Sequence, residues 1–210
     1  MPGLSPPDAR VVFHTALGGV LHLAQVVPRL PLLRLPSLAS PWGAWGWVEL
    51  VARALLLNGA SSRADDPIWP LLATLDQRDA GSPLGAPVQA TTARAAQGWL
   101  PPAARRRPLP PAATAIVPDG GLRLAEQAVA AAVEQLTAQL ARPLEYLIER
   151  LLCRRATIVA DRALLDVHYA MDGTDPDAQL LHRAAFDADA GWLRPFGRAV
   201  HLRGLGTRDP

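Results

Sequence analysis

The chain has no lysine, a single cysteine and little net charge. All 21 basic residues are arginines, and 19 acidic residues leave a formal net charge of +2 over 210 residues. Residues 10–79 carry +1, residues 80–121 carry +3 and residues 122–210 carry −1, so no segment is basic enough for a nucleic-acid-binding domain. A GC-rich genome is the simplest reason for the arginines, and phosphate recognition by guanidinium groups is the alternative.

The one cysteine, Cys153, excludes an intramolecular disulfide and a cysteine-based zinc site. It lies beside Leu151 and Leu152 in a helical pattern, which predicts a buried thiol rather than a catalytic nucleophile. The five histidines show no HExxH spacing, and residues 172–177 lack the pattern of a calcium loop. The sequence therefore predicts no metal and no cofactor.

Catalytic motifs are missing as well. The serines lie in proline-rich or turn-like surroundings without a nucleophile elbow, and no glycine cluster is followed by the lysine of a phosphate-binding loop. We therefore predict a non-enzymatic protein with no catalytic residue and no small-molecule substrate. A hydrolase that uses Asp166 with His168 or His182 is the enzymatic alternative.

The longest apolar run, residues 11–27, raises the question of a membrane span. It is only about long enough to cross a bilayer, and it contains two histidines and a glutamine. Pro28 and Arg29 follow where a secretory signal would have a small-residue cleavage site. We expect no membrane insertion and a cytoplasmic location.

Apolar residues make up 50% of the chain, which is enough to bury a core, and proline is also abundant. Residues 1–9 hold three prolines without periodicity and read as a loose leader. Residues 80–121 contain eight prolines and five glycines among alanines. This composition cannot offset the entropy of ordering, so it predicts a disordered linker.

Residues 10–79 read as a tryptophan-rich helical unit. Apolar residues recur at helical spacing over 10–35, where Gly18 and Gly19 permit either a close neighbour or a break. A second helix begins at Ser40 as N-cap with Pro41 at its first position, and a third follows Asp65-Asp66-Pro67.

Residues 122–210 read as an α+β unit. The segment 122–155 predicts a long helix kinked at Pro143, and residues 156–160 and 163–171 predict a hairpin with one buried face. A helix from Pro176, a turn at Gly191 and a final strand over 199–205 follow. The expected fold is therefore α+β and mostly helical, with the kinked helix packed on a small antiparallel sheet.

Tryptophan is concentrated in the helical unit. The tryptophans at 42, 45 and 47 cannot all face one side of a helix, so at least one should be exposed or meet a second surface. The candidate interface residues are Trp42, Trp45, Trp47 and Trp69.

Arginine clusters give the alternative function, a binding module for nucleic acid or an acidic partner. Residues 105–107 are three consecutive arginines between prolines, and their simplest interpretation is a solvated charge cluster. Nucleic acid is therefore not the expected partner. The residues of this alternative patch are Arg105, Arg106, Arg107, Arg154 and Arg155.

Two stretches resemble a known family. The C-terminal stretch containing Asp189, Gly191, Trp192, Pro195, Gly197, Arg198 and Val200 is similar to the DPGW…GR-V-F ending of uncharacterised bacterial proteins encoded with extracellular contractile injection systems, which are phage-tail-like particles. The N-terminal VFHTALGGVLHLAQVV, the tryptophan-rich WGAWGWVELVARALL and DDPIWPLLATLD resemble the other end of that family. The resemblance implies a cytoplasmic structural or assembly accessory protein whose partners are other particle proteins. It also implies a structural role for Asp189, Gly191, Trp192, Gly197 and Arg198.

Overall fold

The computed structural model describes residues 10–30, 42–57, 63–85, 105–118, 120–170, 189–193 and 196–204. The strands are β1 (Val11–Thr15), β2 (Ala156–Ala160), β3 (Leu164–Tyr169), β4 (Asp189–Leu193) and β5 (Arg198–Gly204). The main helices are α1 (Leu23–Val26), α2 (Ala44–Leu56), α3 (Ile68–Leu75), α5 (Pro111–Thr114), α6 (Leu122–Leu140) and α7 (Leu144–Leu147). Three short helices are not α-helical. They are the 3-10 helices η1 (Gly18–His22) and η2 (Val27–Arg29) and the π-helix η5 (Ile148–Leu152).

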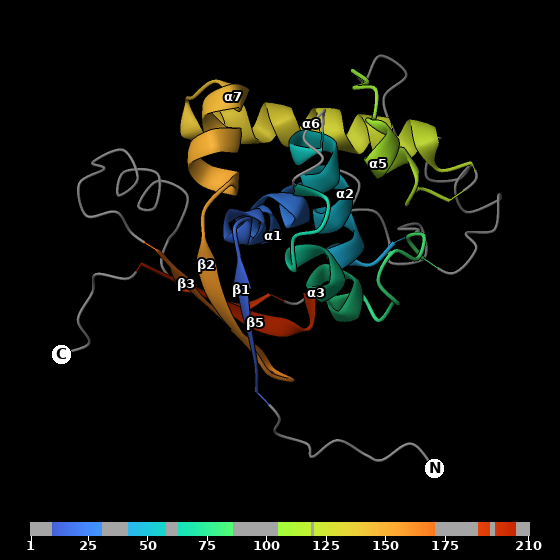
Figure 1. Cartoon of the computed structure of the whole chain (residues 1–210). Helices are drawn as coiled ribbons and strands as arrows, with labels where there is room; N and C mark the ends of the chain where they lie inside the picture. The colour runs from blue at the N-terminus through green and yellow to red at the C-terminus, as the bar shows by residue number, and fades with distance from the viewer. Residues whose placement is uncertain are drawn as a thin grey trace, which may run out of the picture.

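The fold is α+β and mostly helical, as the sequence predicts. Figure 1 shows three layers, with α6 and α7 at the top, α1 and α2 beneath them, and the sheet below. The long helix therefore packs on α1 and α2, which separate α6 from the sheet. The predicted helix 122–155 comes close to the sheet at its C-terminal end, where η5 contacts η1 and leads into β2.

The sheet has five strands in the order β1-β2-β3-β5-β4. The predicted hairpin is confirmed, because β2 and β3 pair antiparallel from Ala156↔Tyr169 to Ala160↔Leu165. The prediction of a purely antiparallel sheet is wrong for one strand pair, because β3 and β5 run parallel. β5 thus runs in the same direction as β3. β4 lies at the far edge of the sheet and is the antiparallel neighbour of β5. Gly191, the predicted turn, lies within β4, and the helix predicted from Pro176 lies outside the described residues.

The first part of the predicted helix over 10–35 is instead the edge strand β1. It pairs antiparallel with β2 from Val11↔Ala160 to Thr15↔Ala156. Its β-branched and aromatic residues fit a pleated surface, and pairing with a distant strand overrides the helical spacing. The helical prediction holds over 18–29, where η1, α1 and η2 follow. β1 thus brings the N-terminal unit into the C-terminal sheet, and both units share one hydrophobic core.

Helix α2 lies at the centre of that core. Twelve of its 13 residues are buried, and it contacts α1, α3, α5 and α6. The helix begins after Gly43, which is the N-cap, while the predicted cap Ser40 and Pro41 lie outside the described residues. A Cβ atom on Gly43 would overlap the carboxylate of Asp76, so a side chain there would displace this carboxylate from its pair with Arg78.

The predicted disordered linker is partly ordered. Leu84 and Ala113 are fully buried and Ile116 nearly so, and the amide of Leu84 donates to the carbonyl of Ile116 over 2.8 Å. The amide of Arg107 likewise donates to the carbonyl of Glu126 in α6. These few apolar anchors fix residues 80–85 and 105–118 although the average composition is that of a linker. Residues 86–104 lie outside the described part of the chain.

The long helix is broken at the predicted kink. α6 ends at Leu140, Ala141 adopts a left-handed conformation with φ of 48°, and Pro143 is extended as the N-cap of α7. Proline disfavours helical geometry in the preceding residue and removes one helical hydrogen bond, which explains a complete break. The apolar residues that recur every three or four positions in 122–155 predict one buried stripe on this helix. Most of them are buried and two are partly buried: Val129, Leu136, Leu144, Leu147 and Leu151 in the first group, and Val133 and Leu140 in the second.

Gly18 and Gly19 permit a close neighbour, which is the first of the two predicted roles. A Cβ atom on Gly19 would overlap the carbonyl oxygen of Leu151, and one on Gly18 would overlap the Cβ of Ala156. Turn η1 therefore lies directly against the end of η5 and the start of β2. This contact fixes β1 relative to the rest of the sheet.

Replacing Gly19 with alanine should lower the free energy of unfolding by about 1–3 kcal/mol, because the added methyl group forces the backbone of η1 away from Leu151. Chemical denaturation followed by circular dichroism measures the change. Ala138→Ser at an exposed position of α6 is the control and should change stability by less than about 0.5 kcal/mol. Equal stability of Gly19→Ala and the wild type would show that η1 and η5 are not in close contact.

Candidate functional site

The tryptophans predicted as an interface are buried in the core. Trp42, Trp45, Trp47 and Trp69 are between 1% and 4% exposed. The prediction that one of them meets solvent or a partner is therefore wrong for the described fold. The two tryptophans of α2 do meet different neighbours, since Trp45 packs on Phe196 and Trp47 on Trp42. Because α2 is surrounded on all sides, each direction leads to another part of the same chain.

Each tryptophan has its own neighbour within the core. The rings of Trp42 and Trp47 are 4.3 Å apart, and Trp45 packs edge-on against Phe196 with its indole nitrogen donating to the Phe196 carbonyl over 3.2 Å. The indole nitrogen of Trp69 donates to the carbonyl of Arg63 over 2.7 Å. These contacts hold the helices and the start of β5 together.

A buried network of four charged side chains supports the same region and was not predicted. Glu49 of α2 is 1% exposed, and its carboxylate pairs with the guanidinium groups of Arg53 and Arg78. Arg78 also pairs with Asp76 over 2.6 Å and donates to the carbonyl of Ser82. Burial by itself lowers the pKa of Arg78, but the hydrogen bonds to Asp76 and Glu49 outweigh burial and raise it. The network is neutral overall and links α2 to the segment after α3.

The outer face of the sheet carries a set of polar side chains that are at least partly exposed. Strand register places His14, Thr157, His168 and Arg203 in one row across β1, β2, β3 and β5. A second row on the same face consists of Val12, Val159, Asp166 and His201. The predicted alternation of β3 is confirmed, because Leu165, Val167 and Tyr169 are buried and the residues between them are partly exposed. Three of the five histidines thus lie on one surface.

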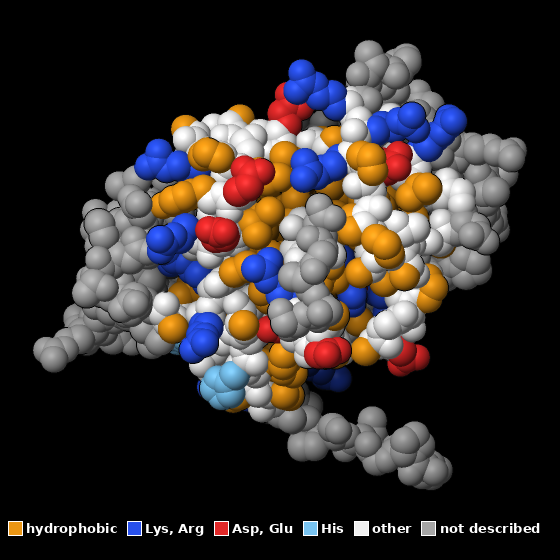
Figure 2. Space-filling model, turned by 45° about the horizontal axis from the view of Figure 1, so that its top comes forward, with side chains coloured by type: hydrophobic (Ala, Val, Ile, Leu, Met, Phe, Trp, Pro, Cys, Tyr) orange, Lys and Arg blue, Asp and Glu red, His pale blue; other side chains and the backbone are white. Residues whose placement is uncertain are grey.

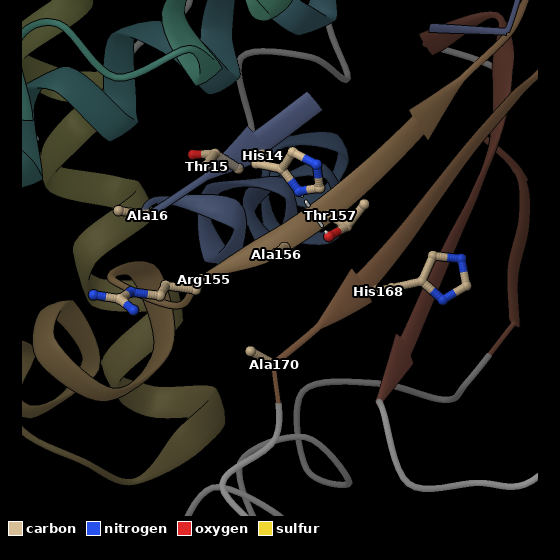
Figure 3. Close-up of a pocket in the computed structure, with 8 residues that line it drawn as sticks. All are labelled: His14, Thr15, Ala16, Arg155, Ala156, Thr157, His168 and Ala170. Atoms are coloured by element: carbon tan, nitrogen blue, oxygen red, sulfur yellow. Dashed lines mark hydrogen bonds between the residues drawn. The ribbon is translucent and has the colours of Figure 1, made fainter. Parts of the chain in front are cut away.

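A hollow of about 360 Å³ opens at one end of this face. It is lined by residues from the ends of β1, β2 and β3: His14, Thr15, Ala16, Arg155, Ala156, Thr157, His168 and Ala170. Figure 3 shows the side chains of His14 and Thr157 side by side, with His168 on the next strand and Arg155 at the opposite end. The Nδ1 atom of His14 lies 3.1 Å from the hydroxyl oxygen of Thr157, which fixes the imidazole ring.

The residues of the hydrolase alternative are partly brought together. The imidazole of His168 lies 3.2 Å from the carboxylate of Asp166, and the same carboxylate pairs with Arg203 over 3.0 Å. His168 lines the hollow but Asp166 does not, and His182 lies outside the described residues. Asp166 therefore contacts both His168 and Arg203 on the sheet surface, outside the lining of the hollow.

The arginines of the alternative patch fall into two groups. Arg106 lies 3.8 Å from Glu126 near the start of α6, whereas Arg154 and Arg155 follow η5, at the other end of the helical layer (Figure 1). Figure 2, which views the α6 side, shows arginines dispersed among acidic and apolar side chains. The two groups do not form one continuous patch, and binding of nucleic acid stays an untested prediction.

The family-motif residues surround the last strand pair. Asp189, Gly191 and Trp192 are in β4, whose side chains lie outside the description, and Gly197 turns the chain with φ of 61°. The guanidinium of Arg198 donates to the carbonyl of Asp161 in the β2–β3 turn.

Asp161 organises that turn. The backbone amides of Ala163 and Leu164 donate to its carboxylate over 2.8 and 2.7 Å. These two hydrogen bonds, and more weakly Arg10 and Arg198, lower the pKa of Asp161. The motif position Arg198 therefore ties β5 to the hairpin, which is consistent with a structural role.

Three further predictions from the sequence concern the Cys153 thiol, a membrane-spanning helix and a metal site. Cys153 is half-buried, and burial raises the pKa of its thiol, which opposes formation of a reactive thiolate. Within the described ranges, no helix has the length and apolarity to cross a membrane. Nor do the described histidine, cysteine and acidic residues form a group of three or more that could hold a metal ion.

Comparison with protein-family models, curated proteins and solved structures found no match.

Proposed function

We propose that this chain is a non-enzymatic structural or assembly accessory protein of a contractile injection system, which binds other particle proteins in the cytoplasm through strand β1. The resemblance of both ends of the chain to the family encoded with these systems suggests the particle. The exposed edge of β1 is the observation that supports protein binding.

β1 is the first strand in the sheet order, so only one of its two edges pairs with another strand of the described sheet. Val11 and Val12 are 48% and 55% exposed, and they are two of the three large apolar side chains that the described surface exposes. Residues 11–15 contain no proline and no formally charged side chain. Natural edge strands usually carry prolines or charged side chains, which prevent pairing with other chains. An edge without them, such as that of β1, can accept a strand from another protein.

The end of β1 is fixed, which prepares the edge for a partner. The hydroxyl of Thr15 donates to the carboxylate of Asp66, and the amide of Ala16 donates to the same carboxylate over 3.0 Å. A partner strand would therefore add along residues 11–14. Main-chain hydrogen bonds would supply affinity, and the exposed valines would favour an apolar, uncharged segment.

The test is co-expression with the sheath, tube and baseplate proteins of the same gene cluster, followed by affinity purification. The wild-type chain should co-purify with one of them. Val12→Lys should weaken that complex at least about tenfold, because a charge in the added sheet repels an apolar strand. Leu122→Lys, at an exposed apolar position of α6, is the matched control and should bind like the wild type.

A chain that stays monomeric and unassociated in this system would refute the proposal. Equal binding by Val12→Lys and the wild type would refute the role of β1. Because residue 12 is exposed, the melting temperature of Val12→Lys should stay close to that of the wild type, and this separates loss of binding from loss of folding.

A further inference from the structure

We propose that two copies of the free chain pair with each other through the open edge of β1, in an antiparallel and two-fold symmetric arrangement. The existence of this dimer rests on the structure alone, whereas its role rests on the proposed function. In that role the second copy covers the edge of β1 until a particle protein takes its place. The main-chain directions, the end charges and the side chains of β1 support this pairing.

The main-chain groups of Val12 and His14 point toward the open edge. Main-chain hydrogen bonds join Arg155 and Asp161, which flank β2, to the side of β3. Because main-chain groups alternate in direction along a strand, the even positions of β2 face β1, and the register pairs them with the odd positions of β1. The even positions of β1 therefore face outward. The amide of Ala16 agrees with this direction, since it donates to a side-chain carboxylate rather than to β2.

Opposite charges lie at the two ends of β1. The side chain of Arg10, just before the strand, is 73% exposed and lies 4.0 Å from Asp161. Asp66 holds the amide of Ala16 just after the strand, and the neighbouring Asp65 is exposed. An antiparallel second copy brings its Arg10 toward these carboxylates, whereas a parallel copy would bring the two arginines together. Because like charges on adjacent strands repel, the ends of β1 favour antiparallel pairing.

A two-fold axis at Val12 gives both outward positions of β1 a partner. Val12 then lies opposite Val12 of the second copy, and His14 lies opposite Arg10. On the other face of the strand, Val11 lies opposite Phe13. Val11 and Val12 are 48% and 55% exposed in the single chain, and this register covers both with apolar side chains. β1 is itself the apolar, uncharged segment that its own edge favours.

The strand is short, so the dimer should be weak. β1 has five residues, and pairing along them buries less surface than a standard stable interface. Association of this size is typically transient. A particle protein that adds further contacts beyond the strand can therefore displace the second copy by mass action.

The test is sedimentation velocity of the full chain over a range of concentrations that reaches about 1 mM. The wild type should change from monomer to dimer as its concentration rises. Val12→Lys and Val12→Glu, each alone, should dimerise at least about tenfold more weakly, because like charges meet at the two-fold axis. An equimolar mixture of the two variants should restore the dimer. Leu122→Lys, at an exposed apolar position of α6, is the matched control and should dimerise like the wild type.

Four results would overturn the dimer. They are a wild type that stays monomeric at every concentration, unchanged dimerisation of Val12→Lys, a mixture that stays as monomeric as its two components, and equal weakening in Leu122→Lys. The mixture is the most specific arm, because only a contact between residue 12 and its own copy lets the opposite charges compensate each other.

The outcome is separable from that of the proposed function. A monomeric chain that still co-purifies with a particle protein overturns the dimer and leaves the proposed function intact. A chain that dimerises but binds no particle protein keeps the dimer and removes its role. A complex with a particle protein in which two copies remain paired through residue 12 would overturn the replacement of the second copy.

Discussion

Replacing Glu49 with alanine should lower the free energy of unfolding by about 3–5 kcal/mol. The carboxylate is 1% exposed and pairs with Arg53 and Arg78, so its removal leaves positive charge that is largely shielded from water. The alanine also leaves space beside α3. Urea denaturation followed by circular dichroism measures the change, provided that the variant is produced folded.

Two further variants show whether the loss comes from uncompensated charge. In the double variant Glu49→Met with Arg53→Met, one charge of each sign is removed and the pair of Arg78 with Asp76 is kept. This variant should be more stable than Glu49→Ala. Glu134→Ala, an exposed acidic position of α6, is the control and should change stability by less than about 0.5 kcal/mol. A loss of similar size in both single variants would contradict the network.

Replacing Trp47 with alanine should lower the free energy of unfolding by about 3–5 kcal/mol. The side chain is 1% exposed and packs against Trp42, so its removal opens a large cavity at the centre of the molecule. Thermal unfolding of the isolated chain measures the effect. This experiment also separates a core tryptophan from an interface tryptophan, because an interface residue contributes little to the stability of a chain without its partner.

Leu122→Ala supplies the comparison for Trp47. Leu122 is 43% exposed at the start of α6, so its truncation should cost less than about 0.5 kcal/mol. If Trp47→Ala were as stable as Leu122→Ala, the tryptophan would be accessible and the original interface prediction would be restored. A folded but weakened Trp47→Ala supports the buried position.

Local patterns predicted the elements that depend on local chemistry. The hairpin of β2 and β3 was predicted because its apolar residues alternate, and the break at Pro143 follows from the geometry of proline. The apolar side of the long helical segment is largely buried, but in α6 it covers α1 and α2 rather than the sheet. A stripe shows that a helix has a partner surface, but not which surface that is.

Long-range pairing decided the elements that were missed. Residues 11–15 fit a helical spacing, and only the pairing with β2 makes them a strand. The order of Leu84 and Ala113 was missed because a few buried side chains outweigh the composition of 80–121. The ion pair of Glu49 was missed, although a lone acid in an apolar helix with Arg53 one turn later is a signal for a buried pair.

The hollow could not have been predicted from the sequence. His14 and Thr157 are 143 positions apart, and His168 joins them only through the register of β2 with β3. No motif has that spacing, since the site arises from strand order. The sequence did identify Asp166 and His168 as a pair, and their contact is real, although Arg203 of β5 is their third member.

The pairing of β1 with β2 has a consequence for how the protein is made. A ribosome releases the N-terminal residues first, so α2 with its tryptophans emerges well before α6 and the sheet that cover it. The strand at residues 11–15 must wait for residues 156–160 before it can pair. The core of the nascent chain therefore stays incomplete until the sheet residues are made, and we expect its folding to be slow because its contacts are distant in sequence.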